Sequence, residues 1–171
     1  AVRKLFIQNI AMFERFERIE QRLSIYDDNF NKLFDAIESK ELKPKQGIFY
    51  EGQIFDAYAF VSELIKSAKK SIILIDNYVD ETVLTMLSKN QEVQISIYTK
   101  TISKQFKLDL EKYNSQYKTL TLKEFDLSHD RFLLIDDEIY HIGASLKDLG
   151  KKWFGFSKMH KESFEIIGRI N

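Results

Sequence analysis

Apolar residues at the start of the chain recur at alternating intervals of three and four positions, as they do along the seam of a coiled coil. Nine of the ten seam positions from Leu5 to Ile37 are apolar, and the tenth, Asn9, is a polar residue of the kind that fixes register. At ~1.5 Å per residue the seam is about 50 Å long. We expect the rest of the chain to be too small to cover an apolar stripe of this length. We therefore expect residues 1–40 to form a helix that dimerises as a coiled coil; an amphipathic helix packed on its own domain is the alternative.

A short segment interrupts this pattern. Residues 40–47 contain the chain's one proline, Pro44, and end at Gly47, with several lysines between. Proline cannot continue a helix and glycine favours turns, so we place a domain boundary here. The predicted parts are a dimerisation helix at 1–40 and a second domain at 41–171.

Strand-like and helix-like patterns alternate through the second domain. Apolar or alternating runs predict short strands, and apolar residues at helical spacing predict the helices between them. Such alternation is typical of an α/β sheet flanked by helices. The predicted strands are 48–50, 71–78, 93–99, 120–125, 131–136, 139–143 and 164–170, and the predicted helices are 54–70, 81–89 and 103–113.

The most informative candidate for chemistry lies at the strand predicted from residue 131. His129 and Arg131 are two residues apart, so in a strand both side chains project from one face. The apolar run 132–135 indicates a strand covered on both sides, and Asp136 ends it. A guanidinium offers phosphate oxygens a planar fork of donors, and an imidazole beside it can attack phosphorus or protonate a leaving oxygen. This pairing favours a phosphate site.

The motif resembles that of the phospholipase D superfamily, which reads His-x-Lys-x-x-x-x-Asp, then six residues and Gly-Ser. Here His129, Arg131 and Asp136 keep the spacing, and Gly143 follows after six intervening residues. The resemblance implies a phospholipase-D-like mixed sheet, with His129 as nucleophile or acid, Arg131 as phosphate clamp and Asp136 in support. Arginine replaces the family's lysine, and the run 143–146 reads Gly-Ala-Ser-Leu instead of Gly-Ser-x-Asn, so Ser145 would stand in for the motif's serine.

Three interpretations of this motif stay open: an active phosphodiesterase, a phosphate-binding or dimerisation module without turnover, and a chance match. The family uses two such motifs per active site, and this chain has one. The resemblance therefore implies a homodimer in which one His129 forms a phosphohistidine and His129 of the partner subunit protonates the leaving group. This mechanism requires neither a metal nor a cofactor. We expect the substrate to be nucleic acid, because the sequence has no apolar stretch suited to a lipid.

A looser resemblance covers the whole chain. The runs 52–58, 75–78 and 141–152 are similar to the C-terminal region of bacterial and prophage-type proteins that carry a KilA-N-like DNA-binding module. The resemblance implies that the DNA-reading module lies outside this chain, which would supply dimerisation and a phosphate-handling domain.

A lysine-rich segment with interleaved aromatic residues follows the motif. Lys147, Lys151 and Lys152 are the candidates for contacts with nucleic acid beside Arg131. The alternative is a solvated loop with its rings in the core, which the chain's zero net charge favours. The segment 147–161 contains Lys147, Lys151, Lys152, Lys158 and Lys161 with one acidic residue, Asp148, and the rings of Trp153, Phe154 and Phe156.

Two further features have simpler explanations. Asp76 and Asp80 lie at the C-terminal end of a predicted strand, where ligands of open α/β sheets gather, but loop solvation and helix capping explain them better than a metal does. We interpret His141 as a structural residue of the neighbouring strand.

The composition of the chain excludes several classes of protein and site. The chain has no cysteine, so disulfides and thiolate metal sites are excluded. No apolar stretch approaches the ~20 residues that span a bilayer. The 26 basic and 26 acidic residues cancel, so any contact with a polyanion must come from a local patch. We expect a cytoplasmic protein without a membrane span.

Overall fold

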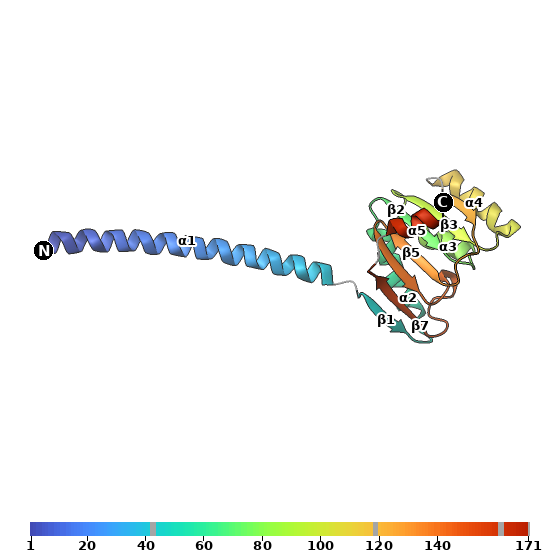
Figure 1. The fold of residues 1–171 in the computed structure, drawn as a ribbon, viewed down its shortest axis with the longest axis horizontal. Helices are drawn as coiled ribbons and strands as arrows, with labels where there is room; N and C mark the ends of the chain where they lie inside the picture. The colour runs from blue at the N-terminus through green and yellow to red at the C-terminus, as the bar shows by residue number, and fades with distance from the viewer. Residues whose placement is uncertain (42–43, 118–119, 161–162, 171) are drawn as a thin grey trace. The chain divides into compact units, whose positions relative to one another are not determined.

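The computed structural model describes residues 1–41, 44–117, 120–160 and 163–170. The chain divides into two compact units, Ala1–Pro44 and Lys45–Asn171. The first contains one helix, α1 (Val2–Glu41), drawn in blue in Figure 1. Its seam residues are largely exposed, with Leu5 at 60% and Ile19 at 50%. The predicted N-terminal helix is confirmed, and its pairing as a coiled coil stays a prediction.

Within the described residues, the second unit is built on one seven-stranded mixed sheet of order β1-β7-β6-β5-β2-β3-β4 (Figure 1). One half, β2-β3-β4, is parallel, and the other half, β1-β7-β6-β5, is antiparallel, with β5 also antiparallel to β2. The α/β class with a mixed sheet is therefore confirmed. The strands are β1 (Gln46–Phe49), β2 (Ser71–Ile75), β3 (Gln94–Thr99), β4 (Leu120–Glu124), β5 (Arg131–Ile135), β6 (Glu138–Ile142) and β7 (Phe154–Met159).

Helices connect the parallel strands, because parallel neighbours need crossover connections. α3 joins β2 to β3 and α4 joins β3 to β4. Asp80 caps α3 by accepting a hydrogen bond from Thr82 N at 3.0 Å, and Ser103 caps α4 by accepting one from Phe106 N at 3.1 Å. The helices of this unit are α2 (Ile54–Ser67), α3 (Glu81–Leu87), α4 (Lys104–Gln116) and α5 (Ser163–Ile170), with a short 3₁₀ turn η1 (Leu146–Asp148).

The main core cluster lies on one face of the sheet, where apolar residues of neighbouring strands stand opposite each other. Ile72 of β2 pairs with Ile135 of β5, and Leu74 pairs with Leu133; all four are at most 3% exposed. Helices α2 and α3 contribute further buried residues to the same cluster. Side chains alternate along a strand, so this face continues from Leu74 to Asp76, the first residue after β2.

Two predictions about the C-terminal part are wrong. Residues 164–170 were expected to form a strand, but α5 is a helix in which Glu165 and Arg169 pair one turn apart. The predicted loop after residue 147 is wrong where β7 forms between β1 and β6, whereas the predicted burial of rings from this segment is confirmed for Phe154 and Phe156. Phe154 and Phe156 alternate around a glycine and are each 5% exposed, which is the period of a strand with one buried face.

The described helices include none that is both long enough and apolar enough to cross a membrane.

Candidate functional site

A pocket of about 600 Å³ opens where β5 begins and β6 ends. It brings together segments that are far apart in the sequence: the end of β2, the start of β5, and the turn from β6 through η1 to β7. Its lining is basic and aromatic, with one acidic side chain. The lining residues are Tyr78, Arg131, Gly143, Ala144, Ser145, Lys147, Asp148, Lys151, Lys152 and Trp153.

Asp76 lies behind this lining and is fully buried. The register that pairs Ile75 with Phe132 places Arg131 opposite Asp76, one position further along both strands. Asp76 Oδ1 accepts a hydrogen bond from Tyr78 N at 3.0 Å, and Oδ2 accepts one from Leu146 N at 2.9 Å. Burial raises the pKa of Asp76, while these hydrogen bonds and the charge of Arg131 oppose the increase.

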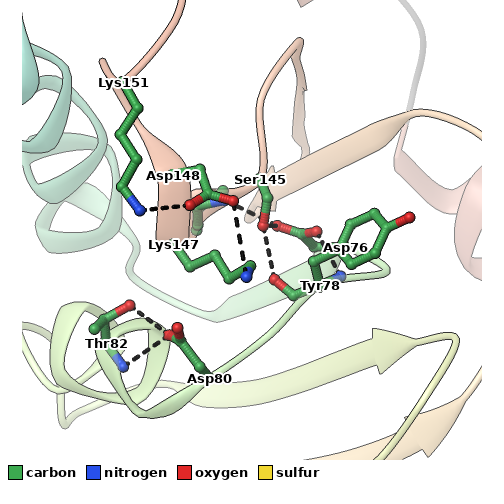
Figure 2. A network of polar contacts seen from close by, with 9 residues as sticks. Asp76, Tyr78, Asp80, Thr82, Ser145, Lys147, Asp148 and Lys151 are labelled. Carbon is green, nitrogen blue, oxygen red and sulfur yellow. Dashed lines mark hydrogen bonds and ion pairs between the residues drawn. The ribbon is translucent and has the colours of Figure 1, made fainter.

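Ser145 connects the turn after β6 to the segment after β2. Its Oγ lies 2.9 Å from Asp76 Oδ2 and 2.7 Å from the carbonyl oxygen of Tyr78 (Figure 2). A hydroxyl has one proton, so it donates to one of these acceptors at a time. Because Ser145 is only 5% exposed, its visible role is to fix the two segments that form the pocket floor.

Asp148 organises two of the three lysines. It accepts a hydrogen bond from Lys151 Nζ at 2.7 Å and lies 3.8 Å from Lys147 Nζ (Figure 2). The hydrogen bond from Lys151 lowers the pKa of Asp148, and the same contact raises the pKa of Lys151. Among the described residues, no ion pair involves Arg131 or Lys152. These two cations therefore have no carboxylate partner in direct contact.

His129 is not among the pocket's lining residues. β5 begins at Arg131, so His129 lies in the bend before this strand and is exposed. The bend is held in place by Asn77, whose Nδ2 donates to Ser128 O at 3.0 Å. Continuing the β5–β6 register would put His129 opposite Ala144, which does line the pocket.

Asp136 lies at the opposite end of β5 from Arg131, roughly 16 Å away for five strand residues. Its carboxylate accepts hydrogen bonds at 2.7–3.1 Å from the backbone N–H groups of Lys69, Lys70 and Ser71. Burial alone would raise the pKa of Asp136, but these bonds and the charge of Lys70 outweigh it, so the pKa is lowered. The contacts fix the bend between α2 and β2 rather than a ligand.

The structure therefore gathers five of the predicted site residues, namely Arg131, Ser145, Lys147, Lys151 and Lys152, and leaves out His129 and Asp136. Sequence reasoning missed the buried position of Asp76 and the place of Tyr78 in the lining. One signal was available for Asp76, since Ile72, Leu74 and Asp76 alternate onto one face. Within the described part of the chain, no group of three His, Cys, Asp or Glu residues could hold a metal ion.

No protein-family model and no curated protein matches this chain. Solved structures do. NucT from Helicobacter pylori is similar over 74% of this chain and 91% of its own, with a TM-score of 0.53 and 13% identity. Phosphatidylserine synthase from Haemophilus influenzae is similar over 74% of this chain and 36% of its own, with a TM-score of 0.52 and 14% identity. Both belong to the phospholipase D superfamily. The fold is phospholipase-D-like.

A third structure, the archaeal chromatin protein TrmBL2, is similar over 93% of this chain at a TM-score of 0.48 and 14% identity. The chain spans 62% of TrmBL2 and 36% of the synthase, less than two thirds of either protein. The resemblance to KilA-N-like proteins gains no support from these matches and stays an expectation.

Proposed function

We propose that the phospholipase-D-like domain binds the phosphodiester backbone of nucleic acid in the pocket that begins at Arg131. The observation that carries the proposal is the gathering of four cationic side chains, Arg131, Lys147, Lys151 and Lys152, around one pocket of a chain with no net charge. Asp148 offsets one of these charges, which leaves a lining of formal charge +3. A local cationic surface of this kind attracts polyanions.

Arg131 is the centre of the proposed site. It stands at the end of a rigid strand, and buried Asp76 lies opposite it across the register. The guanidinium lies over the ring of Tyr78 at 5.8 Å, and the negative charge of Asp76 acts on it without a direct contact, so its donors remain free for phosphate oxygens. Gly143 lines the same pocket and lies close to β7, where an added Cβ would meet Gly155 O at 2.9 Å. The pocket wall is therefore closely packed at this position.

Hydrolysis by His129 is the second candidate function. Two observations favour it: His129 precedes Arg131 by two residues, as in the motif of the phospholipase D superfamily, and the fold is similar to those of NucT and phosphatidylserine synthase. In this mechanism His129 forms a bond to phosphorus as the leaving oxygen departs, and water then cleaves the phosphohistidine. The leaving oxygen receives its proton from His129 of the partner subunit, so the proposal requires a dimer.

Binding is tested by fluorescence anisotropy with a labelled single-stranded oligonucleotide. Arg131→Ala should weaken binding roughly 10- to 150-fold, because a hydrogen bond to a charged group is worth ~1.5–3 kcal/mol. Arg169→Ala is the control: it removes the same kind of side chain from α5, outside the pocket lining. Equal affinities for wild type and Arg131→Ala would rule out the site.

Hydrolysis is tested separately with the same oligonucleotide in EDTA. Activity should persist there, because an imidazole nucleophile needs no metal. Mixing wild-type chains with His129→Ala chains should reduce activity with the square of the wild-type fraction if two imidazoles share one site. A linear decrease would mean that each subunit acts alone. Binding without any cleavage would leave the domain as a nucleic-acid-binding module.

A further inference from the structure

Trp153 is the chain's one tryptophan, and 65% of it is exposed. Burial of a large aromatic ring is among the strongest contributions to a core, so an exposed indole forgoes that stabilisation. Its neighbours Phe154 and Phe156 are each 5% exposed and belong to the core cluster. The lysine-rich segment thus has two structural rings and one ring that lines the pocket.

Among the described residues, one aromatic ring packs against the indole. The ring of Tyr50 packs against it at 4.7 Å between centroids and at 86°, an edge-to-face arrangement. In such a pair at most one face of the indole is covered, whichever ring presents its edge. Tyr50 is itself fixed by a turn before α2, since its N–H donates to Gln53 Oε1 at 2.8 Å. Trp153 is therefore braced and keeps a free face.

The backbone before Trp153 is also fixed. Gly150 has a φ of +73°, and a Cβ there would lie 2.6 Å from Gln53 O and from Ile54 Cα, so only glycine fits. Gly150 O accepts a hydrogen bond from Gly52 N at 3.0 Å, and Lys151 N donates to Asp148 O at 3.2 Å. A ring on a fixed loop loses little conformational entropy when it contacts a ligand.

Cations and exposed rings share the lining of this pocket. Lys151 and Lys152 directly precede Trp153, and the guanidinium of Arg131 lies over the ring of Tyr78 at 5.8 Å. Single-stranded nucleic acid presents phosphates and unstacked bases side by side, and proteins bind it with positive grooves and aromatic faces. In a duplex the base faces are already stacked and cannot reach an indole.

We propose that Trp153, braced by Tyr50, stacks on a base of single-stranded nucleic acid whose phosphate lies in the Arg131 pocket. This inference rests on the proposed function and specifies its ligand as single-stranded rather than double-stranded. The indole contributes to affinity through base faces, so it should be indifferent to a backbone that carries no bases.

The test uses the full chain and two single-stranded DNA oligonucleotides of equal length, one with bases and one abasic. Because Trp153 is the one tryptophan, its fluorescence should be quenched by the first oligonucleotide and unchanged by the second. Trp153→Ala should weaken binding of the base-containing strand roughly 5- to 150-fold and leave binding of the abasic strand unchanged. Trp153→Phe, which keeps a ring, should lose less. Phe55→Ala is the matched control, since Phe55 is 78% exposed and does not line the pocket.

Each other outcome has a defined meaning. If Arg131→Ala weakens binding of both strands and Trp153→Ala weakens neither, the proposed function stands and the stacking inference is overturned. If wild type binds neither strand, the proposed function fails and the inference falls with it. Two other results would overturn the inference, in each case with Trp153 fluorescence that does not respond to oligonucleotide. Fluorescence that changes on dilution would assign the ring to a protein contact, and fluorescence that changes with vesicles of an anionic phospholipid would assign it to a lipid surface.

Discussion

Replacement of Asp136 distinguishes a residue that holds the fold from a residue that handles phosphate. The phospholipase-D-like motif groups Asp136 with Arg131, but the structure separates them along β5. Asp136 contacts the backbone of residues 69–71, which form the bend between α2 and β2. We therefore predict that Asp136→Ala destabilises the domain and that the folded variant still binds nucleic acid with wild-type affinity.

The magnitude follows from the contacts. The carboxylate accepts from three backbone N–H groups, and removal of this set should cost about 2–4 kcal/mol, given ~1.5–3 kcal/mol for a hydrogen bond to a charged group and incomplete additivity. Asp136 also has a φ of +53°, which should add about 1 kcal/mol for alanine. Asn tolerates that conformation and keeps one acceptor oxygen, so Asp136→Asn should lose only about 1–2 kcal/mol.

The contribution of Asp136 to the free energy of unfolding also depends on pH, and its pKa fixes the direction of this dependence. Because the folded-state pKa of Asp136 lies below its ordinary value of 3.8, its contribution is present above that value and is lost as pH falls through the folded-state pKa. Urea unfolding of wild type and Asp136→Asn should therefore give free energies that converge as the solution is acidified. Two results would refute the reasoning: a stability unchanged in Asp136→Ala, or a folded Asp136→Ala variant with the weak binding expected of Arg131→Ala.

Two further predictions concern other parts of the chain. Asp76→Ala should reduce the unfolding free energy by about 2–4 kcal/mol, since it leaves one buried and one partly buried N–H group without their acceptor. Because burial raises the pKa of Asp76, wild type should gain stability relative to Asp76→Asn as pH falls toward the ordinary value of 3.8, and a constant difference would contradict this. Removal of residues 1–40 should leave the second unit folded and convert the expected dimer to monomer, which light scattering would measure; a truncated chain that remains dimeric would show that the helix seam is not the dimer contact.

The parts of the fold that sequence could predict are those with local periodicity. The seam of α1 and the apolar runs of β2, β3 and β5 have patterns that one element explains by itself. β7 was missed because its alternation spans only Phe154, Gly155 and Phe156 within a lysine-rich run, and its burial depends on partners β1 and β6. In α5 the isoleucines fit a strand or a helix, and the chain folds them as a helix.

Sequence could predict those site residues that lie close together along the chain, but not those brought together from distant segments by the fold. Arg131 and the residues of the following turn were found because a known spacing links them in sequence. Asp76 was not, because its contacts with Ser145 and Leu146 span about 70 positions and arise from the antiparallel pairing of β2 with β5. Trp153 belongs to the aromatic residues that the sequence places among lysines, but only its exposure in the structure distinguishes it from Phe154 and Phe156.

Arg131 stands where the motif of the phospholipase D superfamily has a lysine, and this difference limits the chemistry that the pocket residues can perform by themselves. An arginine keeps its proton at any pH of interest, so Arg131 can bind and orient a phosphate but cannot transfer a proton to it. Proton transfer would then fall to His129, which is exposed in the bend before β5 and outside the lining. Within one chain the described pocket therefore contains binding groups without an imidazole. Catalysis would require the His129 imidazole of this chain or of a second chain to reach the phosphate in the pocket, whereas binding requires only the cationic residues that already line it.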